Sequence, residues 1–308
     1  MSAALARACC LWALGLLLIA GCGGPSAEPE RVWGKRGVQP GDFVKPRAIA
    51  IDADDRLYIV DFTARIQVYD RDGNYQGITW ATPDYRNGRP SGLSIDRDGN
   101  LLVSDSHYGC LRIYSPAGEL LRTLGPQIVG NSPARFGYIC DAVQDADGNY
   151  YVAEFGENQR ITKLDADGRL VRFWGCTGDE PGQFNRIRAL ALGPDGNLYV
   201  ADACNHRIQV FDREGNLLRC WGEPGEAPGQ LKYPYDLAFG PAGALYVVEY
   251  GNHRVQKFTP DGVSMGCWGE PGKLPGLLHS PWALAVDSKG RVHVCDSENH
   301  RVQRIRMD

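Results

Sequence analysis

Short apolar runs that end in an acidic residue recur along most of the chain. There are six of them: LYIVD ending at Asp61, LLVSD at Asp105, YYVAE at Glu154, LYVAD at Asp202, LYVVE at Glu249 and VHVCD at Asp296. Successive acids are separated by 44, 49, 48, 47 and 47 residues. A spacing this regular indicates one supersecondary unit repeated six times.

Each unit shows the same order of signals. An apolar run such as DLAFG is followed by a tight turn such as PDGN, a second strand, a polar loop, a third strand such as RIQVFD, another turn and a last strand. Strands joined in this way predict a four-stranded antiparallel meander. One such sheet cannot bury both of its faces, so the units must stack around an axis. The sequence therefore predicts an all-β fold, a six-bladed β-propeller of four-stranded antiparallel blades.

An aromatic residue near the end of the fourth strand marks most units. The positions are Trp33, Trp80, Trp174, Trp221 and Trp268, with Leu124 in the second unit. We expect these side chains to pack between blades. The sixth unit stops after its third strand, and RVWG at residues 31–34 has the form of a fourth strand with no unit before it. The N-terminal strand is expected to complete the last blade, because an unpaired edge would otherwise remain.

The loop between the second and third strands carries Asn-His-Arg at residues 205–207, 252–254 and 299–301. On these triplets and on the period, residues 31–308 resemble the NHL-repeat family, whose members form six-bladed β-propellers. The triplet is altered in the first three units, at residues 63–65, 108–110 and 158–160.

The repeated histidine raises the question of a shared metal site. In a six-fold ring, equivalent points of neighbouring blades are as far from each other as they are from the axis. With the innermost strand roughly 7 Å from the axis and strands about 4.8 Å apart, the start of the third strand lies roughly 16 Å out, so neighbouring histidines are roughly 16 Å apart. Zinc needs its donors about 2 Å from one centre. We interpret the triplet as scaffold, in which the acid ending strand two pairs with the arginine beginning strand three. The expected pairs are Asp61 with Arg65, Glu154 with Arg160, Asp202 with Arg207, Glu249 with Arg254 and Asp296 with Arg301.

Only the first strand of each unit is close enough to the axis for side chains of different blades to meet. Alignment of the units places six residues there, which form the candidate ligand-binding ring: Arg47, Ser91, Cys140, Arg188, Tyr235 and Trp282. Two arginines with two aromatic rings suit an anionic or planar ligand. The alternative is that these side chains plug the channel and that the arginines neutralise nearby acids.

The family resemblance also raises an enzymatic alternative. NHL-like propellers include the lyase domain of peptide-amidating enzymes, which holds zinc through histidines in a Pro-His pattern at the start of innermost strands. Here Arg47, Ser91, Tyr235 and Trp282 follow the corresponding prolines. We assign no catalytic residue, no metal ligand and no cofactor. The expected function is non-enzymatic binding of a protein, peptide or small molecule on the loop face and channel mouth. A propeller hydrolase or lyase, lactonase-like or amidating-lyase-like with a metal near the channel, stays open.

The first residues show a targeting pattern. An apolar run at residues 11–20 is too short to span a bilayer but has the length of a signal-peptide core. It leads into LIAGC, which resembles the lipobox of bacterial lipoproteins and implies lipidation of Cys22. We expect a signal peptide at 1–21, a flexible tether at 22–30 and the propeller at 31–308, anchored in the bacterial cell envelope and facing the periplasm. A plain secretory signal is the alternative. A net charge of -4 disfavours a nucleic-acid partner.

Export permits disulfides. Cys176 and Cys204 fall on one face and are a candidate bridge, with Cys110 and Cys140 a weaker one. In the loops entering the blades, the expected contact aromatics are Tyr85, Phe136 and Tyr138.

Overall fold

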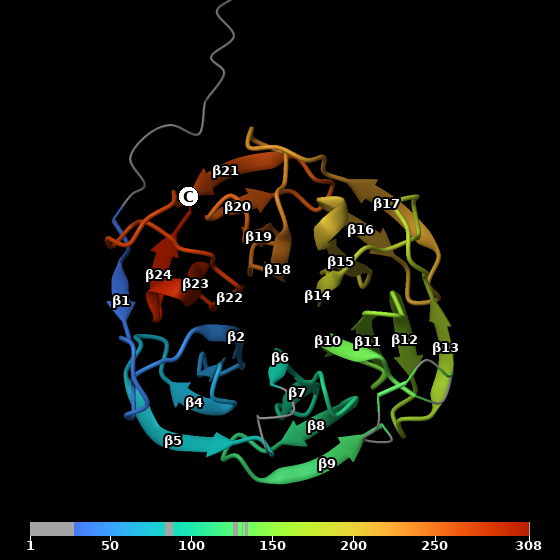
Figure 1. Cartoon of the computed structure of the whole chain (residues 1–308), viewed down its shortest axis with the longest axis horizontal. Coiled ribbons are helices and arrows are strands. Elements are labelled where there is room, and N and C mark those ends of the chain that lie inside the picture. Colours follow the sequence, from blue (N-terminus) through green and yellow to red (C-terminus); the bar gives the residue numbers. More distant parts are fainter. Residues whose placement is uncertain (1–27, 84–88, 126–128, 131, 133–134, 308) are drawn as a thin grey trace, which may run out of the picture.

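The structure is a computed structural model that describes residues 28–83, 89–125, 129–130, 132 and 135–307. Its strands form six four-stranded antiparallel sheets arranged as blades around a central axis (Figure 1). The predicted six-bladed β-propeller is confirmed. The leader, Cys22 and Tyr85 lie outside the described residues.

Every blade runs outward from an innermost strand that lines the axis. Blade one contains β2 (Pro46–Ile51), β3 (Leu57–Asp61), β4 (Arg65–Tyr69) and β5 (Tyr75–Ala81). Blade two contains β6 (Pro90–Ile95), β7 (Leu101–Asp105), β8 (Cys110–Tyr114) and β9 (Leu120–Leu124). Blade three contains β10 (Tyr138–Gln144), β11 (Tyr150–Phe155), β12 (Arg160–Leu164) and β13 (Leu170–Trp174). Blade four contains β14 (Ile187–Leu192), β15 (Leu198–Asp202), β16 (Arg207–Phe211) and β17 (Leu217–Trp221). Blade five contains β18 (Pro234–Phe239), β19 (Leu245–Glu249), β20 (Arg254–Phe258) and β21 (Ser264–Trp268). Blade six contains β22 (Ala283–Val286), β23 (Arg291–Asp296), β24 (Arg301–Arg306) and β1 (Arg31–Trp33).

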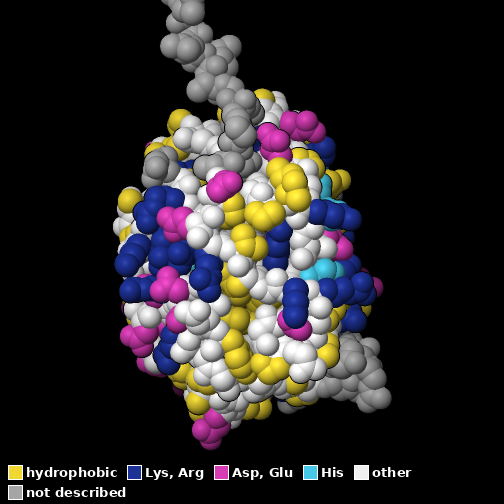
Figure 2. All heavy atoms as spheres, turned by 90° about the vertical axis from the view of Figure 1, so that its left-hand side faces the viewer, with side chains coloured by type: hydrophobic (Ala, Val, Ile, Leu, Met, Phe, Trp, Pro, Cys, Tyr) yellow, Lys and Arg dark blue, Asp and Glu magenta, His cyan; other side chains and the backbone are white. Residues whose placement is uncertain are grey.

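The last blade is completed by the N-terminal strand. β1 pairs antiparallel with β24, and Trp33 lies opposite Val302. Glu30, just before β1, forms an ion pair with Arg304 at 3.2 Å, and Arg304 also reaches Asp72 of blade one at 2.7 Å. Figure 2 shows basic and acidic side chains interspersed on this side of the molecule. The predicted closure of the ring is confirmed.

The hydrophobic core lies between blades rather than within them. Each of the six buried clusters draws its side chains from two neighbouring blades. Trp33 packs 6.5 Å from Tyr69 of blade one, centroid to centroid. Gly262 of blade five lies so close to Trp221 of blade four that an added Cβ would be 2.5 Å from the indole. The aromatic at the end of the fourth strand is therefore an inter-blade contact, as predicted.

Candidate functional site

The loops that carry the Asn-His-Arg triplet form ion pairs. All five expected acid–arginine pairs are present, with N···O distances of 3.2 Å (Asp61–Arg65), 2.9 Å (Glu154–Arg160), 2.8 Å (Asp202–Arg207), 2.6 Å (Glu249–Arg254) and 2.6 Å (Asp296–Arg301). In blade two, where Cys110 replaces the arginine, Asp105 pairs instead with Arg112 at 3.0 Å. Arg112 is two residues further along β8 and so lies on the same face of the strand.

The repeated histidines connect neighbouring blades. Each uses Nδ1 to accept a hydrogen bond from a backbone N–H at the entrance to the next innermost strand: His206 from Tyr233 (3.1 Å), His253 from Ser280 (2.8 Å) and His300 from Lys45 (3.1 Å). In blade three the side-chain oxygen of Gln159 accepts from Arg186 in the same way, at 2.9 Å. All four donor residues have positive φ, between 49° and 62°. The histidine is therefore an architectural acceptor that fixes a left-handed residue.

This role predicts a pH-dependent stability that a single substitution removes. Burial, followed by the neighbouring His279, lowers the pKa of His253. A histidine with a lowered folded pKa stabilises the protein above its unfolded pKa of about 6.5, and this stabilisation is lost as the pH falls. We expect His253→Ala to reduce the free energy of unfolding at pH 7.5 by about 1 kcal/mol. His253→Gln should preserve that stability, because Gln159 does this in blade three, and should weaken the loss between pH 7 and 5 measured by urea unfolding. Equal pH dependence in His253→Gln and the parent would contradict the role.

The candidate ring lies at the mouth of the central channel. Five of its six members line a cavity of about 280 Å³ along the axis: Arg47, Ser91, Arg188, Tyr235 and Trp282. A β-bulge at the start of the innermost strand leaves Arg47, Arg188 and Tyr235 without a pairing partner and turns each toward the axis. Cys140 occupies the equivalent bulge in β10 but does not line the cavity. It is fully buried, and its Sγ lies 3.4 Å from the carbonyl oxygen of Ala153, so its place in the ring is a correction.

The guanidinium groups of the two arginines lie against aromatic rings. The Arg47 guanidinium lies 4.9 Å from the ring centroids of both Phe62 and Trp282. The Arg188 guanidinium lies 4.7 Å from Tyr235 and 5.4 Å from Trp282. Both Nε atoms are buried without a hydrogen-bond partner. Burial, followed by repulsion from Arg188 and Arg89, lowers the pKa of Arg47 to about 9.

Within the described part of the chain, neither guanidinium takes part in an ion pair, and the acids that end the second strands pair with arginines of their own loops. The alternative that the arginines neutralise nearby acids has no ion pair in its support, but it stays open for Arg188, which acts electrostatically on Asp141 and Asp236 deeper in the channel. Two guanidinium groups that repel each other lie at the channel mouth without a direct ion pair, which favours the binding of an anion there.

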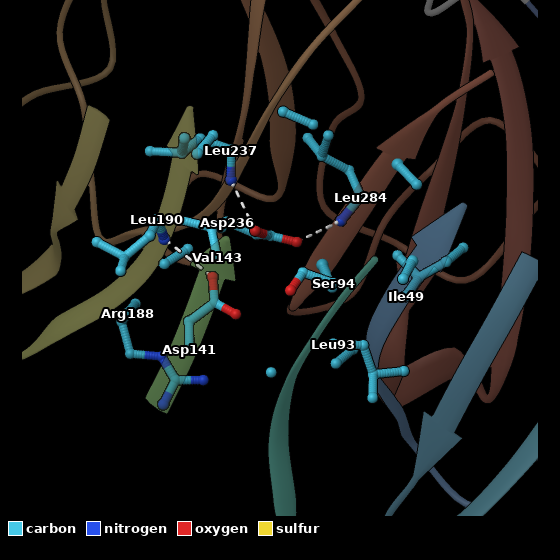
Figure 3. Close-up of a pocket in the computed structure, with 18 of the residues that line it drawn as sticks. Ile49, Leu93, Ser94, Asp141, Val143, Arg188, Leu190, Asp236, Leu237 and Leu284 are labelled. Atoms are coloured by element: carbon cyan, nitrogen blue, oxygen red, sulfur yellow. Dashed lines mark hydrogen bonds between the residues drawn. The ribbon is translucent and has the colours of Figure 1, made fainter. Parts of the chain in front are cut away.

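Two acids deeper in the channel were not predicted. Asp141 on β10 and Asp236 on β18 point into the same cavity, as Figure 3 shows. Each accepts hydrogen bonds from the backbone of the next blade, Asp141 from Leu190 N and Asp236 from Leu284 N, both at 2.9 Å. A signal for them was present, because the aligned positions in the other blades hold only alanine or glycine.

The residues at the channel mouth do not fit a zinc ion held as the amidating-lyase resemblance implies. Arginine, serine, cysteine, tyrosine and tryptophan occupy the positions where that pattern needs histidine. Over the described ranges, no group of three His, Cys, Asp or Glu side chains is arranged to hold a metal ion. His279 has one imidazole near it, that of His253, with ring centroids 5.9 Å apart.

The cysteines and loop aromatics have mixed outcomes. Cys176 is exposed, Cys204 is half-buried and both thiols are free in the structure, so their bridge stays a prediction. Phe136 is 5% exposed and packs in the core between blades two and three, which corrects its expected role as a contact residue. Tyr138 is 38% exposed and packs between His107 and Phe155.

Comparison with known proteins agrees with the fold. The model of the NHL repeat matches residues 184–211, 231–258 and 278–305. Peptidyl-glycine alpha-amidating monooxygenase A of Xenopus laevis is 32% identical over 126 residues, which is 38% of this chain and 13% of that protein. NHL repeat-containing protein 3 of Mus musculus is 29% identical over 169 residues, 51% of this chain and 49% of that protein. The chain thus spans half or less of the length of these relatives.

A solved structure extends the likeness to the whole ring. Virginiamycin B lyase from Staphylococcus aureus superposes with a TM-score of 0.61 over 86% of this chain and 96% of its own, at 16% identity. At this identity the match shows a common propeller fold.

Proposed function

The chain is an NHL-repeat β-propeller, and on that premise we propose that it binds an anionic ligand at the mouth of its channel and acts as a binding protein rather than as an enzyme. The observation that carries this proposal is the pair Arg47 and Arg188, which lie between aromatic rings, lack a hydrogen-bond partner at both Nε atoms and form no ion pair among the described residues. A bound carboxylate, phosphate or sulfate would supply the missing acceptors.

Because proteins similar to this chain include an amidating monooxygenase and a lyase, an enzymatic function is the alternative. The channel mouth of this chain offers cations and aromatic rings at the positions where the zinc-lyase pattern needs ligands. What supports binding at the mouth is that these side chains recognise charge and shape, and none of Arg47, Arg188 and Trp282 is a general base near neutral pH. Asp141 and Asp236, deeper in the same cavity, are the groups that an enzymatic function would use.

The double substitution Arg47→Gln with Arg188→Gln tests the site. Acetate and phosphate should raise the melting temperature of the parent in a concentration-dependent way. Each charge-assisted hydrogen bond contributes about 1.5–3 kcal/mol, so loss of both should weaken anion binding roughly 100-fold or more. The melting temperature without anion should change little, because the substitutions remove the repulsion between the two guanidinium groups and glutamine retains a polar side chain.

The matched control is Arg169→Gln with Arg172→Gln, on exposed side chains in and beside β13. This variant should keep the anion response of the parent. An undiminished response in the channel variant, measured by calorimetric titration, would contradict the proposed function.

We also propose that the propeller is lipid-anchored through Cys22 and faces the periplasm. The support is the LIAGC sequence after a short apolar run. Over the residues that the structure describes, no helix has the length and apolarity needed to cross a bilayer. Mass spectrometry of the mature protein should find an acylated N-terminal Cys22, and Cys22→Ser should release the protein from membranes. An unmodified N-terminus at another residue would contradict the anchor.

A further inference from the structure

Two carboxyl groups lie one residue deeper along the innermost strands than the mouth positions. Asp141 follows Cys140 on β10, and Asp236 follows Tyr235 on β18. The equivalent positions of the other blades are small: Ala48, Gly92, Ala189 and Ala283. A Cβ built on Gly92 would lie 2.5 Å from the carboxylate of Asp141, so this group fills space that another blade leaves open. The propeller scaffold does not require an acid at this level.

Backbone N–H groups alone bind these carboxylates. Asp141 accepts from Ala142 and Leu190, both at 2.9 Å. Asp236 accepts from Leu237 at 2.8 Å and from Leu284 at 2.9 Å. Two oxygens offer about four acceptor sites, so about half remain unused on each group. In the described chain no Lys, Arg or His forms an ion pair with either acid.

The surroundings make these unpaired acids costly. The cavity wall near them is formed by the apolar side chains of Leu93, Val143 and Leu190 and by the hydroxyl group of Ser94 (Figure 3). Burial raises the pKa of Asp236 to about 7, and burial followed by the charge of Asp236 raises the pKa of Asp141 well above its usual range. Arg188 contributes a second unpaired group, since it is 8% exposed and its Nε lacks a partner. One cavity thus holds cations at its mouth and acids one residue below, and Arg188 acts electrostatically on both acids without forming an ion pair with either.

We propose that the ligand of this channel is a small zwitterion, with its anionic group between Arg47 and Arg188 and its ammonium group against Asp141 and Asp236. This inference rests on the proposed anion site and names its ligand class. A strand rises about 3.3 Å per residue, so one residue between the two levels favours a short spacer between the charges. The cavity of about 280 Å³ lies at the lower limit for ligand pockets, which also favours a small molecule.

The experiment compares ligands that differ only in the ammonium group. Dissociation constants are measured by calorimetric titration for three pairs of equal chain length: glycine with acetate, β-alanine with propionate, and 4-aminobutyrate with butyrate. In at least one pair the amino acid should bind ten or more times more tightly to the parent at pH 8. In the double variant Asp141→Asn with Asp236→Asn, the ratio of the dissociation constants of the carboxylate and the amino acid should fall to about one, and the carboxylate should still bind. The amide oxygen of asparagine can accept only one of the two backbone N–H groups that each aspartate binds, so circular dichroism and thermal unfolding must show an intact fold before the ratio is interpreted.

The outcomes separate the two proposals. If each carboxylate binds the parent as tightly as its amino acid, the zwitterion is excluded and the anion site stands. If neither member of any pair binds, the proposed function fails and the zwitterion with it. If the amino acid retains its advantage in the double asparagine variant, the assignment of the ammonium group to these acids is wrong.

The pH dependence gives a second readout. The charged and titratable groups that act on Asp236 or are acted on by it are Asp141 on β10, Arg188 on β14 and Cys295 on β23. Tyr235 of its own strand lines the same cavity, and β22 presents apolar residues. An ammonium group binds the ionised acids, so the advantage of the amino acid should increase from pH 6 to pH 8. An advantage above tenfold that does not change over this range would overturn the assignment.

Discussion

A chain that begins at Gly34 is expected not to fold into a stable propeller, whereas a chain that begins at Glu28 should fold as the full chain does. The first truncation removes β1 and exposes the backbone edge of β24, which β1 covers from Arg31 to Trp33. It also removes Glu30, whose carboxylate binds Arg304 and Arg306 at 3.2 Å. Circular dichroism and size-exclusion chromatography should show loss of the cooperative transition and aggregation.

A milder variant keeps the closure testable if the truncated chain cannot be purified. Trp33 is 8% exposed and contacts Tyr69 and His293 at centroid distances of 6.5 and 5.8 Å. Trp33→Ala should lower the free energy of unfolding by about 3–5 kcal/mol. Trp80→Ala, at the equivalent but more exposed position of blade one, is the control and should cost less. A full cooperative transition in the chain that begins at Gly34 would show that the ring does not depend on its N-terminal strand.

The number of blades was predictable because every blade is built by the same local chemistry. The acid ending strand two, the turn glycines and the tryptophan ending strand four recur with the period of the backbone, so they report the repeat directly. Arg112 was missed because the partner of Asp105 moved by two residues along β8. A shift of two leaves the strand face unchanged, and a motif read as a fixed triplet does not register it.

The site was predictable only in part, because at a β-bulge the place of a residue along the strand does not determine where its side chain points. Alignment placed Arg47, Arg188 and Cys140 at one level, and the structure brings only the arginines into the cavity. The small thiol turns into the core, whereas the longer side chains reach the axis. Asp141 and Asp236 lie one residue further on, where the alternation of a regular strand would direct a side chain away from that ring. In β18 the bulge allows both consecutive positions, Tyr235 and Asp236, to line the channel, whereas in β10 only Asp141 does.

The second large effect is expected in the buried ion pair of blade four. Asp202 is fully buried and accepts four hydrogen bonds, from Asn185 N (2.7 Å), Asn205 (2.8 Å), Arg207 Nε (2.8 Å) and Gln209 (3.1 Å). Asp202→Asn preserves the shape but removes the charge and directs an NH₂ group at donors. The Arg207 guanidinium, which also binds backbone carbonyls of the preceding loop, then stays buried without its counter-ion.

Removing one partner of a buried ion pair lowers the free energy of unfolding by about 3–5 kcal/mol, whereas an exposed ion pair contributes about 0–1 kcal/mol. We therefore expect Asp202→Asn to lower the free energy of unfolding in urea by that larger amount. Asp212→Asn is the matched control, because Asp212 also accepts backbone N–H bonds, from Glu214 and Asn216, but at an exposed turn of the same blade. Its cost should stay near 1 kcal/mol. Equal costs for the two substitutions would mean that the acid–arginine pair at the loop is not what stabilises the blade, and that the packing between blades accounts for the repeat.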